Sequence, residues 1–146
     1  MTQIKATHST KGASNAAIAA TYIDHAYAAG FLEADGCIHI TKNTACVRVV
    51  NRNTEVLKWF QLRYGGQVRS KVKPEGCWEW NIHSDAAVAF VDCVYDHLLF
   101  KKPQADLLYE FFNTRQKRGI PLPENVVALR ADINSRMKKE KAQWRA

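Results

Sequence analysis

The sequence predicts an α+β fold in which helices pack on one face of an antiparallel sheet, and two observations carry this prediction. Residues 37–50 and 67–83 alternate apolar and polar side chains with the two-residue period of strands, and each stretch contains one turn signal. Segments with helix-capping signals precede, separate and follow these two hairpins. The expected order of elements is α-ββ-α-ββ-α-α, because a hairpin with one apolar side needs helices to cover that side.

The first expected element is a helix from Thr21 to about Asp35. Thr21 is a good N-cap, and Asp24 three residues later approximates a capping box. The helix ends with two carboxylates, those of Glu33 and Asp35, although the C-terminus of a helix favours cations. An exposed carboxylate there costs roughly 0.3–1 kcal/mol, so these acids need an explanation other than helix stability.

Two hairpins follow, with registers that alternation and turn residues predict. Pairing Thr41 with Cys46 leaves a four-residue loop, and pairing Lys73 with Cys77 leaves the three-residue loop 74–76. These registers direct one apolar set toward the helices, with Ser70 the small polar exception: Ile38, Ile40, Val47, Val49, Val68, Val72, Trp78, Trp80 and Ile82. The opposite face is polar and mostly basic.

Further helices complete the expected fold. Asn53 or Thr54 caps one that Gly65 and Gly66 end, and others begin near Ser84 and Pro103. A last helix runs from about residue 124 into the basic stretch RMKKEKAQWR. Residues 1–20 lack a clear period and are expected to form a flexible arm, which leaves 21–146 as one domain with a basic C-terminal helix or tail.

The charge distribution indicates an anionic partner. The net charge is +7, and residues 36–83 hold eight Lys and Arg against three acids, while residues 101–146 hold eleven against five. A surface that serves only solubility mixes the two signs, whereas segregated positive charge is typical of nucleic-acid binding.

Other function classes receive no support from the composition. No apolar run approaches the ~20 residues of a membrane span, and the first twenty residues lack the apolar stretch of a secretory signal, so we expect an intracellular protein without a membrane partner. The four cysteines show no close-paired spacing and are expected to be free thiols.

Small residues recur along the first helix, at Ala26, Gly30 and Ala34, with Ala29 beside them. Such a stripe allows a second helix to approach closely. From spacing alone, packing within one chain is favoured over packing between two chains.

The nine residues from Ala28 to Gly36, AAGFLEADG, resemble the signature of the LAGLIDADG homing endonucleases. Gly30, Asp35 and Gly36 match that signature, and most of the other residues are small or conservative replacements. The order of elements extends the resemblance over roughly residues 21–118. Only one copy of the signature is present, so the chain looks like a single-motif member that acts as a homodimer.

The resemblance implies a saddle-shaped sheet that binds double-stranded DNA, and two motif helices that pack across the dimer axis. The expected dimer-interface residues are Ala26, Ala29, Gly30, Glu33 and Ala34, with a structural role for the Glu33 carboxylate. Asp35 and Gly36 are the expected metal ligands, for Mg²⁺ or Mn²⁺, and the expected catalytic residues are Asp35, Asn51 and Lys101. The metal would offset the repulsion between carboxylates at two helix ends and activate water.

The resemblance also implies that the polar face of the hairpins binds DNA, because a two-stranded ribbon fits the major groove. The candidate DNA-binding residues are Cys37, His39, Thr41, Arg48, Gln67, Arg69, Lys71, Lys73, Glu79 and Asn81. Among them, Asn81 is a candidate for reading adenine and Glu79 for accepting from cytosine.

One position departs from the pattern of single-motif relatives, which often carry an active-site Arg one helical turn beyond the position of Asn51. Glu55 stands there in this sequence. Arg52 is one candidate to replace that charge, and the pair Lys101 and Lys102 is another.

Alternative functions stay open at this level. An RNA maturase, with RNA as the partner, and a non-cleaving DNA-binding protein both fit the same fold and the same basic sheet. A zinc site built from Cys37, His39, Cys46 and Cys77 has a shared sheet face in its favour, but it lacks paired-ligand spacing.

Overall fold

A computed structural model describes residues 20–144, so nearly all of the expected N-terminal arm lies outside the described residues. The elements are α2 (Tyr22–Asp35), β1 (Gly36–Thr41), β2 (Thr44–Asn51), α3 (Thr54–Tyr64), β3 (Gln67–Ser70), β4 (Trp78–His83), α4 (Ser84–Val94), the 3₁₀ turn η2 (Tyr95–His97), α5 (Lys102–Phe112) and α6 (Glu124–Ala142).

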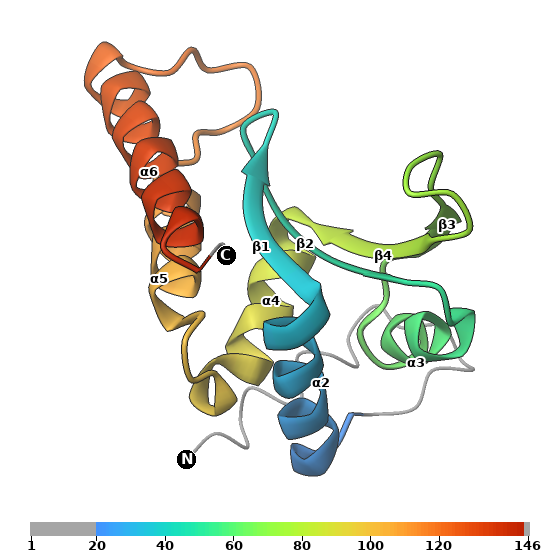
Figure 1. Cartoon of the computed structure of the whole chain (residues 1–146). Coiled ribbons are helices and arrows are strands. Elements are labelled where there is room, and N and C mark those ends of the chain that lie inside the picture. Colours follow the sequence, from blue (N-terminus) through green and yellow to red (C-terminus); the bar gives the residue numbers. More distant parts are fainter. Residues whose placement is uncertain (1–19, 145–146) are drawn as a thin grey trace.

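The predicted fold class is confirmed. The four strands form one antiparallel sheet in the order β1-β2-β4-β3. Figure 1 shows this sheet curving above α2, α3 and α4, with α5 and α6 beside β1. Three described α-helices follow the second hairpin (α4, α5 and α6), one more than the expected order α-ββ-α-ββ-α-α contains.

Helix α2 begins as the sequence predicts. The Thr21 hydroxyl accepts from the Asp24 N–H at 3.2 Å, and the Asp24 carboxylate accepts from the Thr21 N–H at 3.0 Å, which completes a capping box. No basic residue lies in the last turn of α2. The charge conflict at its C-terminus is therefore not relieved within the helix.

The first hairpin has a different register from the predicted one. Thr41 pairs with Thr44 instead of Cys46, and Lys42 and Asn43 form a two-residue turn with φ of 47° and 59°. A turn of this kind needs two left-handed residues, and its twist matches that of the strands. Because the shift is two residues, the side chains keep their predicted faces.

The second hairpin is also shifted by two residues. Lys71, not Lys73, lies opposite Cys77, and the Lys71 N–H donates to the Cys77 carbonyl at 2.9 Å. The strand β3 ends at Ser70, so Val72, predicted to face the core, lies in the loop and is 89 % exposed. Trp78 and Ser70 lie on the predicted face of the sheet, but at its end, where both are exposed.

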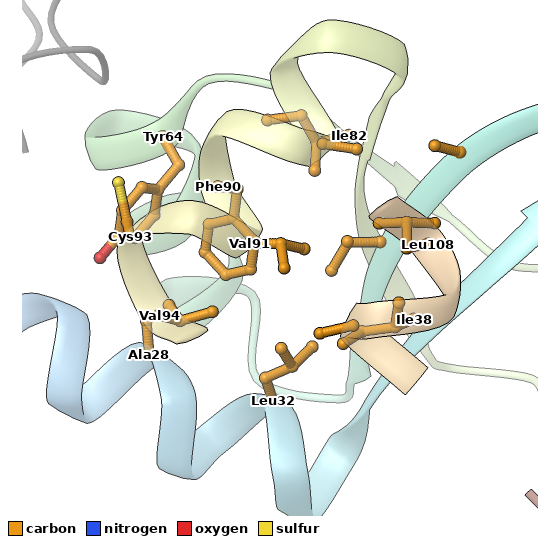
Figure 2. Close-up of a cluster of buried hydrophobic side chains, with 14 of the residues drawn as sticks. Ala28, Leu32, Ile38, Tyr64, Ile82, Phe90, Val91, Cys93, Val94 and Leu108 are labelled. Carbon is orange, nitrogen blue, oxygen red and sulfur yellow. The ribbon is translucent and has the colours of Figure 1, made fainter. Parts of the chain in front are cut away.

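The core lies between the sheet and the helices. Figure 2 shows Ala28 and Leu32 from α2, Ile38 from β1, Phe90 and Val91 from α4, and Leu108 from α5 meeting in one cluster. Trp80 and Phe60 extend the cluster toward α3, with ring centroids 4.8 Å apart. This packing fixes the C-terminus of α2 against the start of β1, which is where the candidate site lies.

Two sequence predictions about chemistry can be compared with the structure. Cys37, Cys46 and Cys77 are free thiols, as expected. Among the residues that the structure describes, no helix has the length and apolar character needed to cross a membrane.

Candidate active site and nucleic-acid interface

Asp35, the last residue of α2, is exposed to solvent beside the end of β2. The Asn51 side-chain amide donates to the Asp35 carboxylate, with 3.0 Å between Nδ2 and Oδ2. The Asn51 oxygen accepts from the Asn53 backbone N–H at 2.8 Å, and this contact fixes the orientation of the amide. The structure therefore brings together two residues that the sequence analysis assigned to one site.

Lys101 lies at the same helix end, at the residue before α5. Its ammonium donates to the carbonyl oxygens of Glu33 at 3.2 Å and of Gly36 at 3.0 Å. Burial lowers the pKa of Lys101, while the nearby Cys37 and Glu33 groups partly oppose that shift. Lys101 thus supplies the cation that the last turn of α2 lacks.

Glu33 points into the protein, away from Asp35. One oxygen of its carboxylate accepts from the backbone N–H groups of Leu99 at 2.8 Å, Phe100 at 2.7 Å and Lys101 at 3.0 Å. These contacts fix the segment that carries Lys101. The carboxylate has the structural role that the sequence analysis expected.

Lys141 of α6 was not among the predicted site residues. Its ammonium lies 3.2 Å from the Cys37 sulfur, and it lines a cavity of about 220 Å³ together with Gly36, Lys101 and Gln104. The only sequence signal for Lys141 was the basic character of the tail, because the contact joins residues 104 positions apart.

The residues considered for the missing basic position lie elsewhere. Glu55 is exposed near the start of α3 and lies 3.5 Å from the Lys58 ammonium. The Arg52 guanidinium lies against Gly76, where a Cβ atom would approach it to 2.8 Å. The Lys102 ammonium lies 5.4 Å from the centre of the Tyr95 ring. The cations around Gly36 are therefore Lys101 and Lys141, not the predicted pair Lys101 and Lys102.

The polar face of the sheet carries the predicted DNA-binding residues on the predicted side. Gln67, Arg69 and Lys73 are exposed, although Lys73 lies in the loop beyond β3. The others are partly exposed: Cys37, His39, Thr41, Arg48 and Lys71. Glu79 and Asn81 are exceptions, because they are only 4 % and 3 % exposed.

Glu79 and Asn81 are held within the protein by their neighbours. The Glu79 carboxylate accepts from Arg69 and Lys71, each at 3.3 Å, and from the Asn81 amide at 3.1 Å. The sequence prediction that these two side chains read base edges is therefore corrected: their polar groups face each other and the cations of the sheet. Alternation predicted the correct face but not the depth, which the flanking long side chains determine.

His39 is neutral at pH 7. Burial lowers the pKa of its imidazole to about 4, and the charges of Arg48 and Lys141 act in the same direction. Cys46, on the same face, is buried, and burial raises the pKa of its thiol to about 11. Neither group adds charge to this face near neutral pH.

The small-residue stripe of α2 is open to solvent. Ala26, Gly30 and Ala34 are exposed, and a Cβ atom built at Gly30 meets no other atom within 4 Å. Ala29 has no exposed surface, and Glu33 is buried. Ala29 and Glu33, which the sequence analysis assigned to a dimer interface, instead contact their own chain: Ala29 packs in the core, and the Glu33 carboxylate binds residues 99–101.

The donor set fits a hard divalent cation only in part. The Asp35 carboxylate and the Gly36 carbonyl are oxygen ligands of the kind that Mg²⁺ prefers. Among the described residues, no group of three or more His, Cys, Asp and Glu side chains lies close enough to hold a metal. One described chain thus offers one exposed carboxylate at this helix end, because that of Glu33 binds the backbone of residues 99–101.

The fold has relatives among solved structures, whereas no protein-family model and no curated protein matches the sequence. The homing endonuclease I-CvuI in complex with its target is 20 % identical, with a TM-score of 0.66 over 82 % of each chain. The archaeal intron-encoded homing endonuclease I-Vdi141I, complexed with DNA, is 19 % identical, with a TM-score of 0.67 over 81 % of this chain and 84 % of that one. The chain has the homing endonuclease fold.

A further homing endonuclease, I-TnaI, matches 83 % of this chain and 97 % of its own, with a TM-score of 0.57 and 19 % identity. At these identities the likeness establishes the fold. It confirms the fold that the motif resemblance implied, and within that fold the end of α2 and the start of β1 carry Asp35 and Gly36.

Proposed function

We propose that this chain is a LAGLIDADG homing endonuclease: a site-specific enzyme that hydrolyses both strands of a long, pseudo-palindromic DNA target as a homodimer. One observation supports this most directly. An exposed acid, Asp35, ends α2 at a position unfavourable for helix stability, and Asn51 and Lys101 from distant elements converge on that helix end.

The homing endonuclease fold supports the DNA partner. Structures of I-CvuI and I-Vdi141I with this fold were determined with DNA bound. In this chain the sheet face opposite the helices carries Arg48, Arg69 and Lys71, which suit phosphate oxygens and guanine edges.

Each residue of the candidate site has a distinct proposed role. The Asn51 side-chain amide orients the Asp35 carboxylate through a hydrogen bond. The same amide would also hydrogen-bond and orient a water molecule beside the DNA strand. Lys101 offsets negative charge that develops on a phosphate near Gly36. Glu33 positions Lys101 by holding its backbone N–H.

The Asp35 carboxylate and the Gly36 carbonyl would hold Mg²⁺ or Mn²⁺, which when bound supplies a more acidic water and charge neutralisation. The structure of I-CvuI determined with Mg²⁺ and that determined with Ca²⁺ are consistent with a divalent ion at this fold. One carboxylate carries only one negative charge, whereas the ion carries two positive charges. The proposed site therefore includes the Asp35 of a second copy.

The homodimer is proposed on the exposed surface of α2. Ala26, Gly30 and Ala34 form an uncovered stripe with no Cβ obstruction at Gly30. Ile23 and Tyr27 flank the stripe and are 79 % and 52 % exposed. Apolar side chains beside a close-approach surface favour contact with a second α2.

The test uses DNA made by joining the two sequences that flank this reading frame, since a homing enzyme acts on the uninterrupted form of its host gene. Purified protein with Mg²⁺ is expected to linearise a plasmid that carries the joined sequence. Asp35→Asn is expected to slow cleavage by about a hundredfold or more while DNA binding is unchanged or tighter. Asp96→Asn, which removes one exposed acid of η2, is the charge-matched control.

Cleavage by Asp35→Asn at the rate of Asp96→Asn would refute the proposed chemistry. A second candidate, a non-cleaving DNA-binding protein, is favoured by one observation about the position that is often basic in relatives. That position holds the acid Glu55, and the neighbouring Arg52 lies against Gly76 and does not line the cavity at Gly36. Tight binding of the joined DNA without cleavage would select it. Preferential binding of the transcribed intron RNA would select the maturase instead.

A further inference from the structure

Glu79 stands at the centre of the basic sheet face. It is the one acidic residue within the four described strands, and it lies directly opposite Arg69 of β3 in the sheet register. The residue is 4 % exposed, while the side chains of Arg48 and Arg69 reach solvent around it. A buried carboxylate on a surface that favours anions requires an explanation.

Both oxygens of this carboxylate are engaged by the protein. Oε2 accepts from Arg69 Nη2 at 3.3 Å and from Asn81 Nδ2 at 3.1 Å. Oε1 accepts from Lys71 Nζ at 3.3 Å and lies 3.7 Å from Arg48 Nη1. Glu79 therefore restrains three cations: Arg48 of β2, Arg69 of β3, and Lys71 directly after β3.

The charge state of Glu79 follows from these contacts. Burial acts to raise its pKa, but the hydrogen bonds and charges of Lys71, Asn81 and Arg69 outweigh burial and hold the pKa below the ordinary value of a glutamate. The group is ionised at neutral pH. Its negative charge then cancels part of the positive charge that Arg48, Arg69 and Lys71 present.

We propose that Glu79 is a specificity-determining residue: it restrains and partly neutralises Arg48, Arg69 and Lys71, so that these cations contribute little to binding of random-sequence DNA. Sequence-independent affinity rises with the number of phosphates that mobile Lys and Arg side chains neutralise. A carboxylate 3–4 Å from three cations lowers that number, and fixed geometry leaves the same cations able to act at a matching site. The inference rests on the DNA-binding function proposed above.

The experiment compares three variants with the wild type. Glu79→Gln removes the charge but keeps the shape, Glu79→Asp keeps the charge, and Glu110→Gln makes the same charge change at the exposed Arg136 pair between α5 and α6. The probes are a random-sequence duplex, titrated at several salt concentrations, and immobilised heparin, a polyanion without bases. Selection from a pool of randomised duplexes measures the sequence preference.

Glu79→Gln is expected to bind the random duplex about three- to tenfold more tightly, with a salt slope steeper by about one unit or more. It is also expected to elute from heparin at higher salt and to enrich sites with weaker base preference. Glu79→Asp is expected to stay close to the wild type. Equal behaviour of Glu79→Gln and Glu110→Gln would overturn the inference, because net charge alone would then explain the change.

Two further outcomes are distinguishable. If the wild type binds no duplex DNA, the proposed function fails, and heparin elution still decides whether Glu79 masks the cations. If Glu79→Gln does not fold, Arg69→Gln in the wild type replaces it. If Glu79 masks Arg69, the Arg69→Gln substitution lowers the salt slope on random-sequence DNA by much less than one unit. A drop of about one unit overturns the inference.

Discussion

Lys101 provides, from a distant part of the chain, the positive charge that the C-terminus of α2 lacks. Its ammonium donates to two carbonyl oxygens at that end, and Glu33 holds the backbone from which Lys101 extends. The local cost of Asp35 is therefore lessened by tertiary contacts. Asp35 is exposed at this helix end, and the buried Lys101 ammonium beside it stabilises the C-terminus of the helix.

Lys101→Met is expected to lower the free energy of unfolding by about 1–3 kcal/mol, because two carbonyl acceptors lose a charged donor. Lys102→Met is the matched control, since the Lys102 ammonium lies over the Tyr95 ring. Urea denaturation at pH 7 measures both variants. Equal stability of the two would mean that the contact of Lys101 with α2 contributes nothing to the fold.

His39 is expected to make stability depend on pH in mildly acidic solution. The unfolded imidazole binds a proton near pH 6.5, whereas the folded one does so only near pH 4, because of burial and the charges of Arg48 and Lys141, which Glu79 partly offsets. Between these values the unfolded state holds more protons, so stability is full above about pH 6.5 and falls as the pH decreases toward 4.

His39→Gln is expected to remove about 1–3 kcal/mol of this loss between pH 6.5 and 4. Chemical denaturation across that range measures the effect, with exposed His83→Gln as the control. A pH profile of His39→Gln that follows the wild type would show that this imidazole is not held neutral in the folded protein.

At the level of the elements, α2 has two surfaces with different tasks. The buried side, with Ala28, Ala29 and Leu32, packs against the core, and the exposed side carries Gly30 and its small neighbours. The two surfaces can be changed separately, because a side chain at Gly30 meets nothing in its own chain.

Gly30→Leu is expected to separate the proposed dimer without destabilising the monomer. Replacing an exposed helical glycine raises helix propensity by about 0.5–1 kcal/mol, while the added side chain blocks close approach of a second helix. Sedimentation measures the mass, and Ala131→Leu, on the exposed side of α6, controls for an added apolar side chain. An unchanged dimer would place the interface elsewhere.

In the two hairpins, the sequence predicted which face each side chain lies on but not the exact register of the strands. Alternation placed Arg48 and Arg69 on the correct face, and it did so even though both registers were wrong by two residues. A shift of two preserves the faces because the strand period is two. The exact register depends on turn geometry, and the left-handed pair Lys42 and Asn43 is not a strong signal in the sequence.

The candidate site was predictable in its local parts only. Asp35 and Gly36 follow from a continuous motif, and Asn51 and Lys101 from matching positions. The contact of Lys141 with Cys37 and that of Glu33 with residues 99–101 depend on how α5 and α6 pack beside β1, which no local pattern specifies. The burial of Glu79 likewise involves side chains of β2, of β3 and of the residue that follows β3.

For the whole molecule, the main consequence of the fold is that the basic C-terminal helix returns to the candidate site. Helix α6 packs on α5 beside β1 (Figure 1). Its Lys141 lies beside Cys37 and lines one cavity with Lys101. Two regions of positive charge that are separate in the sequence become adjacent. A bound strand near Gly36 would meet both.

Lys141→Ala is therefore expected to reduce cleavage at saturating DNA by about tenfold, since one cation beside the reacting phosphate is lost. Lys138→Ala, on the exposed side of the same helix, is expected to change the rate little. Single-turnover cleavage of the joined-flank DNA measures both variants. Equal rates for the two lysine variants would remove Lys141 from the site.

The opposite orientations of Glu33 and Asp35 have a genetic consequence. A screen for inactive alleles should recover changes at both positions, but for different reasons, because Asp35 faces solvent while Glu33 holds three backbone N–H groups of the segment before α5. Alleles at Asp35 should be inactive at every growth temperature. Alleles at Glu33 should be temperature-sensitive, with activity restored in the cold, because they loosen the segment that carries Lys101 and leave Asp35 and Asn51 in place.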